Sequence, residues 1–173
     1  NATMALVPMV VDAVGPIPVI AAGGIADGRG MAAALALGAD GVLLGTRFLA
    51  SDESPLHPNF KQAIINSDGH DTVLTEIPDI CQAKVWPGAM SRATRNSFIE
   101  RWSGREWALR QNQMEALTQM REGRQNGDIE EASLSMGQDA GLIHELLPAG
   151  EIVRCIAAEA EDILALRLPG FLS

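Results

Sequence analysis

The chain has 173 residues, of which 47% are apolar and 20% charged, a balance that suffices for a packed core and excludes a disordered protein. Its formal net charge of −9 argues against nucleic-acid binding through a basic face. No apolar run is long enough to cross a bilayer, and we recognise no targeting peptide or internal repeat. Cys81 and Cys155 lack a CxxC spacing, so we expect reduced thiols in a cytoplasmic protein.

The beginning of the chain predicts a helix followed by a strand. Residues 5–14 are mostly apolar, and Gly15 and Pro16 would end the helix there. Residues 18–22, with the sequence PVIAA, have the length and bulk of a strand that is buried on both faces. The glycine pair at residues 23–24 then stops this strand.

A second helix and a second strand are predicted next. Asp27 is a candidate cap for a helix of small residues, which Gly38 would end. Residues 42–44, with the sequence VLL, predict another buried strand, closed by Gly45 and Thr46. A strand–helix–strand unit of this kind implies a parallel sheet, because the helical crossover returns the chain to the same edge.

Both predicted strands are followed by glycine at their carboxyl ends. In a (β/α)8 barrel, the loops after the last two strands commonly form a phosphate site from backbone N–H groups. Glycine lets the backbone come close to an anion because no Cβ stands in the way. We therefore interpret Gly23–Gly24 and Gly45–Thr46 as two halves of one phosphate cradle. If only one of the two pairs were present, a tight turn that binds no ligand would be the simpler interpretation.

At this point the sequence resembles nitronate monooxygenases, FMN enzymes that were once called 2-nitropropane dioxygenases. Flavin-type enoyl-acyl-carrier-protein reductases share the pattern, and IMP dehydrogenases show a looser version. The chain as a whole is similar to the carboxyl-terminal half of the nitronate monooxygenase family. The likeness rests on AAGGIADGRG at residues 21–30, ALALGADGV at 34–42, GTRF at 45–48, GQDAG at 137–141 and LPAGEIV at 147–153.

The resemblance implies an α/β fold, namely the carboxyl-terminal part of a TIM (β/α)8 barrel with a mostly helical excursion. We expect residues 1–66 to hold the last barrel strands and the phosphate loops. Residues 67–145 would form a mostly helical lid or substrate region, and residues 146–173 would be the final barrel helix. Because a barrel needs about eight strands and two are evident here, we expect an incomplete chain, and a natural short product is the alternative.

The resemblance also implies an FMN cofactor and the oxidation of alkyl nitronates by oxygen. The flavin would perform the redox chemistry while the protein positions it. The best hydrogen-bond donors would be the backbone N–H groups of Gly24, Gly45 and Thr46. Carried over residue by residue, the cofactor-binding positions are Ala22, Gly23, Gly24, Leu43, Leu44, Gly45 and Thr46.

No catalytic residue is assigned, and no metal site is expected. The base of the resembled family is a histidine in an alanine–glycine–glycine–histidine motif, which the resemblance places upstream of this sequence. Residues 22–25 look similar, but Ile25 cannot move a proton, and they align with the phosphate loop instead. The three histidines, His57, His70 and His144, are interpreted as solvated or capping residues.

The middle of the chain departs from the barrel pattern. Residues 59–66 predict a helix, residues 72–76 a strand, and residues 86–96 a loop of basic and apolar side chains. A helical stretch is expected over residues 97–121, with a break at residues 103–104. We further expect a polar connector at 123–128, a helix at 130–134 and a final helix at 151–167, with Glu159 among its water-facing residues.

Two hypotheses compete with nitronate oxidation. One is a related flavin reductase of the enoyl-acyl-carrier-protein type, which would use a nicotinamide cofactor. The other is a non-catalytic fragment that keeps a partial phosphate cradle. The expected partners are a small nitronate substrate and oxygen, with no nucleic acid and no membrane, and a homodimer stays open. The isolated chain is expected to be inactive, because the resemblance places the histidine base outside it.

Overall fold

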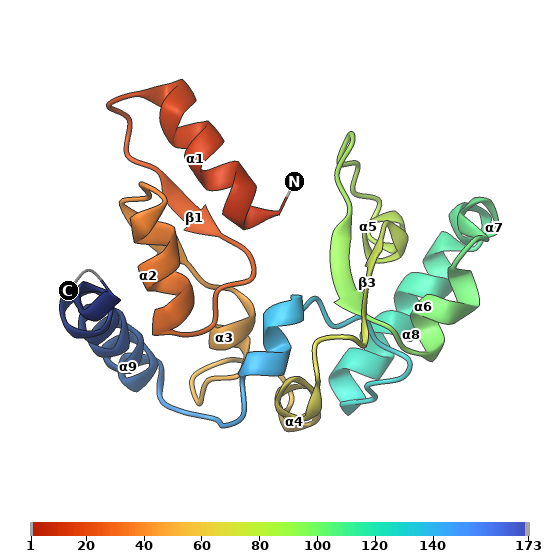
Figure 1. The fold of residues 1–173 in the computed structure, drawn as a ribbon. Coiled ribbons are helices and arrows are strands. Elements are labelled where there is room, and N and C mark those ends of the chain that lie inside the picture. Colours follow the sequence, from red (N-terminus) through yellow and green to blue (C-terminus); the bar gives the residue numbers. More distant parts are fainter. Residues whose placement is uncertain (1, 172–173) are drawn as a thin grey trace. The chain divides into compact units, whose positions relative to one another are not determined.

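The computed structural model describes residues 2–171, which divide into two compact units. Unit 1 comprises Asn1–Ser54 and Glu145–Ser173, and unit 2 comprises Pro55–His144 (Figure 1). The first boundary lies earlier than the sequence pattern suggested. Residues 55–66, which that pattern grouped with the phosphate loops, cluster with the middle of the chain.

Unit 1 is built on a parallel pair of short strands joined by a helix. Strand β1 (Ile20–Ala22) and strand β2 (Gly41–Leu43) pair side by side, and helix α2 (Gly28–Ala36) connects them. Ala22 lies opposite Leu43 in the register, so the two strands end at the same edge. The predicted strand–helix–strand unit and its parallel pairing are thus confirmed.

One face of this strand pair is packed and the other is open. Helix α1 (Thr3–Val14) and α2 contribute to a core around Ala21, the buried residue in the middle of β1. Ile20 is 56% exposed and Leu43 is 63% exposed. The prediction of strands buried on both faces is therefore wrong for this chain, because apolar packing covers only the Ala21 face. The buried residues of this core are Val7, Ala21, Ile25, Ala34 and Ala39.

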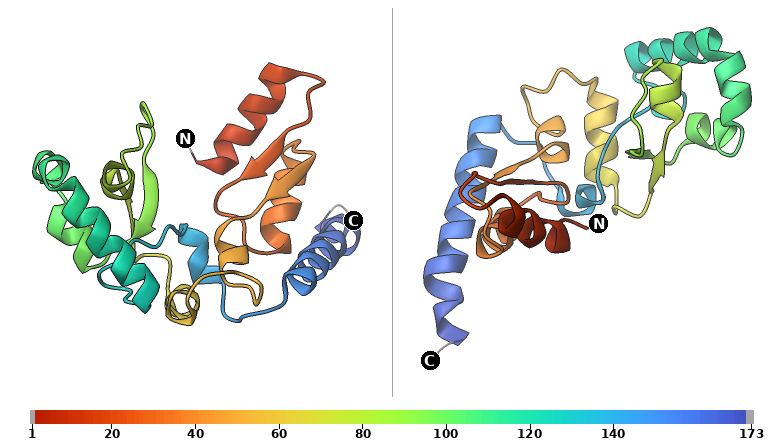
Figure 2. Two further views of the ribbon diagram at one scale, coloured as in Figure 1. Left: turned by 180° about the vertical axis from the view of Figure 1, so that it is seen from behind. Right: turned by 90° about the horizontal axis from the view of Figure 1, so that it is seen from above.

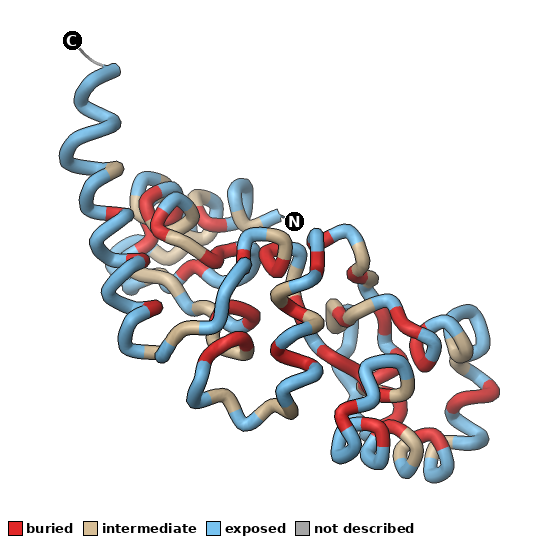
Figure 3. Tube along the Cα trace, turned by 90° about the horizontal axis from the view of Figure 1, so that it is seen from below, coloured by how far each residue is buried: buried red, intermediate tan, exposed pale blue. Residues whose placement is uncertain are grey.

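The end of unit 1 is a long helix that packs against α2. Helix α9 (Ala149–Asp162) buries one stripe of side chains, as predicted from its apolar spacing, and Figure 3 shows most of its remaining surface exposed. The helix begins before the expected start, and a π-helical segment, η2 (Ile163–Arg167), continues it. A short 3-10 turn, η3 (Pro169–Phe171), follows, and the buried stripe consists of Ile152, Ile156 and Ala160.

Unit 2 combines an antiparallel hairpin with helices, which Figure 2 shows from two further sides. Its hairpin consists of β3 (Thr72–Thr75) and β4 (Ser91–Thr94), and its core lies among this hairpin and the four helices that follow α4 (Pro58–Asn66) in the chain. In chain order the elements are α4 (Pro58–Asn66), β3 (Thr72–Thr75), α5 (Ile77–Cys81), β4 (Ser91–Thr94), α6 (Ser97–Trp102), α7 (Glu106–Gln111), α8 (Gln113–Asn126) and the 3-10 helix η1 (Gln138–Leu142).

Three expectations for unit 2 are corrected. The end of the predicted loop at residues 86–96 is strand β4, which forms ladder hydrogen bonds with β3. The predicted connector at residues 123–128 is mostly helical, since α8 continues to Asn126 and ends at Gly127 with φ +68°. The predicted helix at residues 130–134 is irregular. The Asn96 side-chain amide donates to the carbonyl oxygens of Ile129 and Ala132, and these contacts hold the segment outside a helical ladder.

Among residues 2–171, no helix combines the length and apolar character needed to span a membrane.

Candidate functional site

The two glycine-bearing loops lie next to each other in unit 1. Because β1 and β2 are parallel and Ala22 is paired with Leu43, the segments that follow these residues leave the same edge of the sheet. Gly23–Gly24 follows β1, and Gly45 and Thr46 follow β2 after one residue. The structure therefore brings together the two halves of the predicted cradle.

The backbone of both loops is open to a ligand. Gly23 and Gly24 have φ values of +94° and +76°, a region that side-chain-bearing residues rarely adopt. A Cβ added at Gly24 or at Gly45 would have no heavy atom within 4 Å among its non-adjacent neighbours. Both glycines are exposed, so a phosphate group has free space beside their peptide groups.

The leucines between the strand and the second glycine loop differ in exposure. Leu43 is 63% exposed at the end of β2, and it lies opposite the exposed Ala22 of β1. Leu44 is half-buried and packs against the core of unit 1. Leu43 therefore offers an apolar surface beside the cradle, without a side-chain hydrogen bond.

A threonine that the sequence pattern missed holds the first loop. The Thr3 hydroxyl donates to the carbonyl oxygen of Gly23 at 2.7 Å, and it also lies 3.4 Å from the carbonyl oxygen of Ala22. Thr3 begins α1, about twenty positions before the loop. No local motif signals such a contact, because it depends on how α1 packs beside β1.

Asp27 caps the helix that follows the first loop. Its Oδ1 accepts a hydrogen bond from the backbone N–H of Gly30 at 3.1 Å, which confirms the predicted cap. Its other oxygen forms an ion pair with Arg29. Burial raises the pKa of the Asp27 carboxyl, but the hydrogen bonds from Arg29 and Gly30 outweigh burial and hold this pKa below its ordinary value of 3.8.

Arg47 sits directly after the second loop, in helix α3 (Thr46–Leu49), and it is buried. Its Nη1 donates to the carbonyl oxygens of Ala50 at 3.3 Å and of Glu145 at 3.1 Å. Burial lowers the pKa of the Arg47 guanidinium, although the Glu145 carboxylate opposes the shift. These contacts fix the turn after α3 and join it to the segment that leads into α9.

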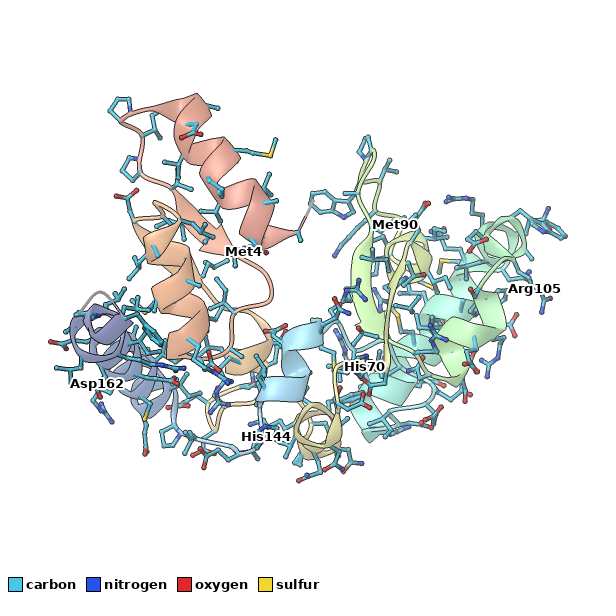
Figure 4. All side chains as sticks on the ribbon, viewed as in Figure 1. Met4, His70, Met90, Arg105, His144 and Asp162 are labelled. Atoms are coloured by element: carbon cyan, nitrogen blue, oxygen red, sulfur yellow. The ribbon has the colours of Figure 1, made fainter. Side chains whose placement is uncertain are left out.

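The three histidines all belong to unit 2, whereas both glycine loops belong to unit 1. His57 caps α4, because its Nδ1 accepts the backbone N–H of Asn59 at 3.2 Å, which confirms a capping role. His70 lies in the turn before β3, and His144 follows η1 (Figure 4). Both are exposed.

Unit 2 also holds a cavity of about 700 Å³ beside the hairpin, within the region where the sequence pattern expected a lid or substrate site. Its apolar wall includes Leu74, Trp86 and Met90, the last labelled in Figure 4. Glu76 and Arg110 lie at the cavity and approach each other to 3.6 Å. The volume is typical of pockets that bind small molecules.

Glycine loops at the carboxyl edge of a parallel strand–helix–strand unit define a class of α/β proteins whose backbone can hold an anion. Within this class, a model of the nitronate monooxygenase family matches residues 1–159. The chain therefore belongs to the nitronate monooxygenase family.

Relatives support the same placement. A probable nitronate monooxygenase from Staphylococcus aureus is 40% identical over 165 residues, which are 94% of this chain and 44% of that protein. FabK from Thermotoga maritima has a TM-score of 0.83 at 40% identity, over 98% of this chain and 52% of that structure. A nitroalkane oxidase from Streptomyces ansochromogenes has a TM-score of 0.75 at 31% identity, over 93% of this chain and 44% of that structure. The chain thus spans about half the length of the relatives it matches.

Proposed function

We propose that this chain is part of an FMN-dependent oxidoreductase that oxidises alkyl nitronates with oxygen. The observation that carries the proposal is the pair of exposed glycine loops at one edge of the β1–β2 sheet, with open space beside Gly24 and Gly45. Membership of the nitronate monooxygenase family supports this assignment. The Staphylococcus aureus relative is named a probable nitronate monooxygenase, and the Streptomyces ansochromogenes relative is named for nitroalkanes, the conjugate acids of nitronates.

In this proposal the chain binds the cofactor through its backbone. The N–H groups of Gly24, Gly45 and Thr46 would hold the phosphate of FMN, and Thr3 would keep the first loop in position through the Gly23 carbonyl. When bound, FMN supplies the redox chemistry, in which electrons leave the nitronate and reach oxygen. The exposed side chain of Leu43 would contribute apolar contact beside the phosphate.

The fold class forms part of the same proposal. Unit 1 would be the carboxyl-terminal part of a TIM barrel, in which further strands cover the apolar surface of Ile20. The catalytic base would come from outside this chain, since the three histidines here are a helix cap and two exposed turn residues. The isolated chain would then bind flavin poorly and show no nitronate turnover.

A second candidate is a flavin-dependent enoyl reductase that uses a nicotinamide cofactor. FabK from Thermotoga maritima supports this candidate. Its sequence identity to this chain is 40%, which equals the identity of the Staphylococcus aureus relative. Both candidates use the same phosphate loops and differ in substrate. Oxygen uptake with a nitronate, compared with NAD(P)H oxidation in the presence of an enoyl thioester, distinguishes them.

The decisive test of the cofactor site is Gly45→Ala in the intact protein. Gly45 has a negative φ of −103°, and an added Cβ meets no neighbour, so the substitution should not disturb folding. The methyl group would instead displace the phosphate from its donors, at a cost of about 1–3 kcal/mol for each hydrogen bond left unmade. We expect loss of bound flavin, whereas the flavin-free forms of the variant and the wild type should unfold at the same temperature.

Gly150→Ala is the matched control. It adds the same methyl group in unit 1, and its nearest contact is the flexible Arg154 guanidinium at 3.5 Å. This control should retain flavin. Full flavin content in Gly45→Ala would remove the cradle assignment.

A further inference from the structure

A second polar cavity lies in unit 2, separate in the chain from the glycine loops of unit 1. Its volume is about 120 Å³, and it is bounded by α5, α8 and the segment at residues 133–135. Arg121, Arg124, Ser133 and Ser135 supply most of its polar groups, and Leu117 forms part of the apolar wall. Neither the sequence pattern nor the proposed cofactor binding uses these residues.

The two arginines share one face of α8, since they are three positions apart on a helix. Arg124 Nη2 donates to the backbone carbonyl oxygen of Ser133 at 3.1 Å, which fixes its guanidinium at the cavity wall. In the described part of the chain, neither Arg121 nor Arg124 forms an ion pair with a carboxylate. The cavity therefore carries two guanidinium charges without a counter-ion, although the chain as a whole has a net charge of −9.

Ser133 provides an independent indication of a ligand. Its side chain is almost fully buried, at 4% relative exposure, and its hydroxyl has no hydrogen-bond partner among residues 2–171. Buried polar groups are nearly always hydrogen-bonded, so the hydroxyl of this cavity-lining residue calls for a partner that the described residues do not supply. Because the hydroxyl oxygen is itself buried, the side chain would turn about its Cα–Cβ bond to donate to an oxyanion in the cavity.

We propose that this cavity binds a phosphate group. Arg121 and Arg124 would neutralise its charge, and guanidinium groups are suited to this because their N–H donors match the oxygens of phosphate in pairs. Ser133 and Ser135 would donate from the opposite wall. A volume of about 120 Å³ accommodates a phosphate group but not a whole nucleotide, so the ligand is inorganic phosphate or the phosphate end of a monoester whose remainder lies outside.

The test is phosphate binding by the full chain in a Gly45→Ala background, which closes the proposed cofactor loops. Inorganic phosphate and glycerol phosphate are titrated separately at constant ionic strength, with ³¹P line broadening and unfolding temperature as readouts. We expect saturable binding that raises the unfolding temperature.

Arg121→Gln should weaken binding about tenfold or more, since a charge-assisted hydrogen bond is lost. Arg154→Gln, an exposed arginine of α9, removes the same charge in unit 1 and should leave binding unchanged.

Ser133→Ala separates a ligand role from a structural one. Removal of an unpartnered hydroxyl should not lower the unfolding temperature without phosphate, yet it should weaken phosphate binding several-fold. Binding of both probes identifies the phosphate group itself as the ligand, and binding of glycerol phosphate alone identifies a monoester. The proposal is overturned if neither probe binds, or if Arg121→Gln and Ser133→Ala both bind phosphate like their parent. Flavin content plays no part in this readout, so the outcome is independent of the proposed function.

Discussion

Glu159 accepts a hydrogen bond from the backbone N–H of Gly28, with 2.7 Å between Oε2 and the amide nitrogen, although the residues are 131 positions apart. The contact joins α9 to the first residue of α2, where a carboxylate also interacts favourably with the helix dipole. Glu159 is exposed, as expected, and its carboxylate makes this contact in addition to facing water. The close approach is possible because residue 28 has no side chain.

Gly28→Ala should destabilise unit 1 by about 1–3 kcal/mol, the usual cost of overpacking. The added Cβ would lie 2.5 Å from Glu159 Cβ and 2.6 Å from the backbone nitrogen of Ala160, so α9 would have to move. Chemical denaturation measures the loss. Gly150→Ala in α9 is the matched control and should be neutral or slightly stabilising, since alanine favours a helix and its Cβ has room. Equal stability of the two variants would contradict the close packing of α2 and α9.

Thr3→Val should weaken flavin binding in the intact protein about fivefold, which corresponds to one hydrogen bond of about 1 kcal/mol. Valine keeps the shape of threonine but cannot donate to the Gly23 carbonyl oxygen, so the first loop loses its anchor. Thr3→Ser keeps the donor and should restore most of the affinity. This prediction depends on the proposed cofactor site, and equilibrium titration with FMN measures it. Wild-type affinity in Thr3→Val would show that the loop holds its shape without the hydroxyl.

The contribution of Asp27 to stability should disappear at acidic pH. The pKa of its carboxyl is lower in the folded protein than the ordinary value of 3.8, so the stabilisation is complete above that value and is lost as the pH falls through the folded pKa. Asp27→Ala should cost about 1 kcal/mol at neutral pH, as loss of a helix cap does.

Urea denaturation of the wild type and of Asp27→Ala over a pH series measures this difference. The difference should shrink once the pH falls below 3.8. Asp12→Ala removes an exposed aspartate of α1 and serves as the control, with little effect at neutral pH. A difference between wild type and Asp27→Ala that stays constant into strong acid would argue against an ionised cap.

The two free thiols should react at very different rates. Burial raises the pKa of Cys81 to about 11, whereas Cys155 is exposed on α9. Since the thiolate is the reactive form, a mildly alkaline solution of dithionitrobenzoate should label Cys155 rapidly and Cys81 only after denaturation. Cys155→Ser should abolish the rapid phase, and a rapid phase that persists in this variant would show that Cys81 becomes accessible in the folded protein.

Local patterns were sufficient for the strand–helix–strand unit. The apolar strand runs, the Asp27 cap and the terminating Gly38 are all short-range signals. The cap and Gly38 are found where they were predicted, and strands β1 and β2 overlap the predicted runs. Strand β4 and the irregular segment at residues 130–134 were missed. Their conformations depend on partners distant in sequence, namely the ladder with β3 and the side chain of Asn96.

The candidate site could be predicted from the sequence, because glycine pairs that follow two apolar strand-forming runs are short-range signals visible in the chain. The contacts that support the site could not be predicted, because they depend on tertiary packing. Thr3 reaches Gly23 because α1 packs beside β1, and Glu159 reaches Gly28 because α9 packs against α2. Such contacts join residues far apart in the chain and are set by the packing of whole helices, so no local periodicity or motif contains them.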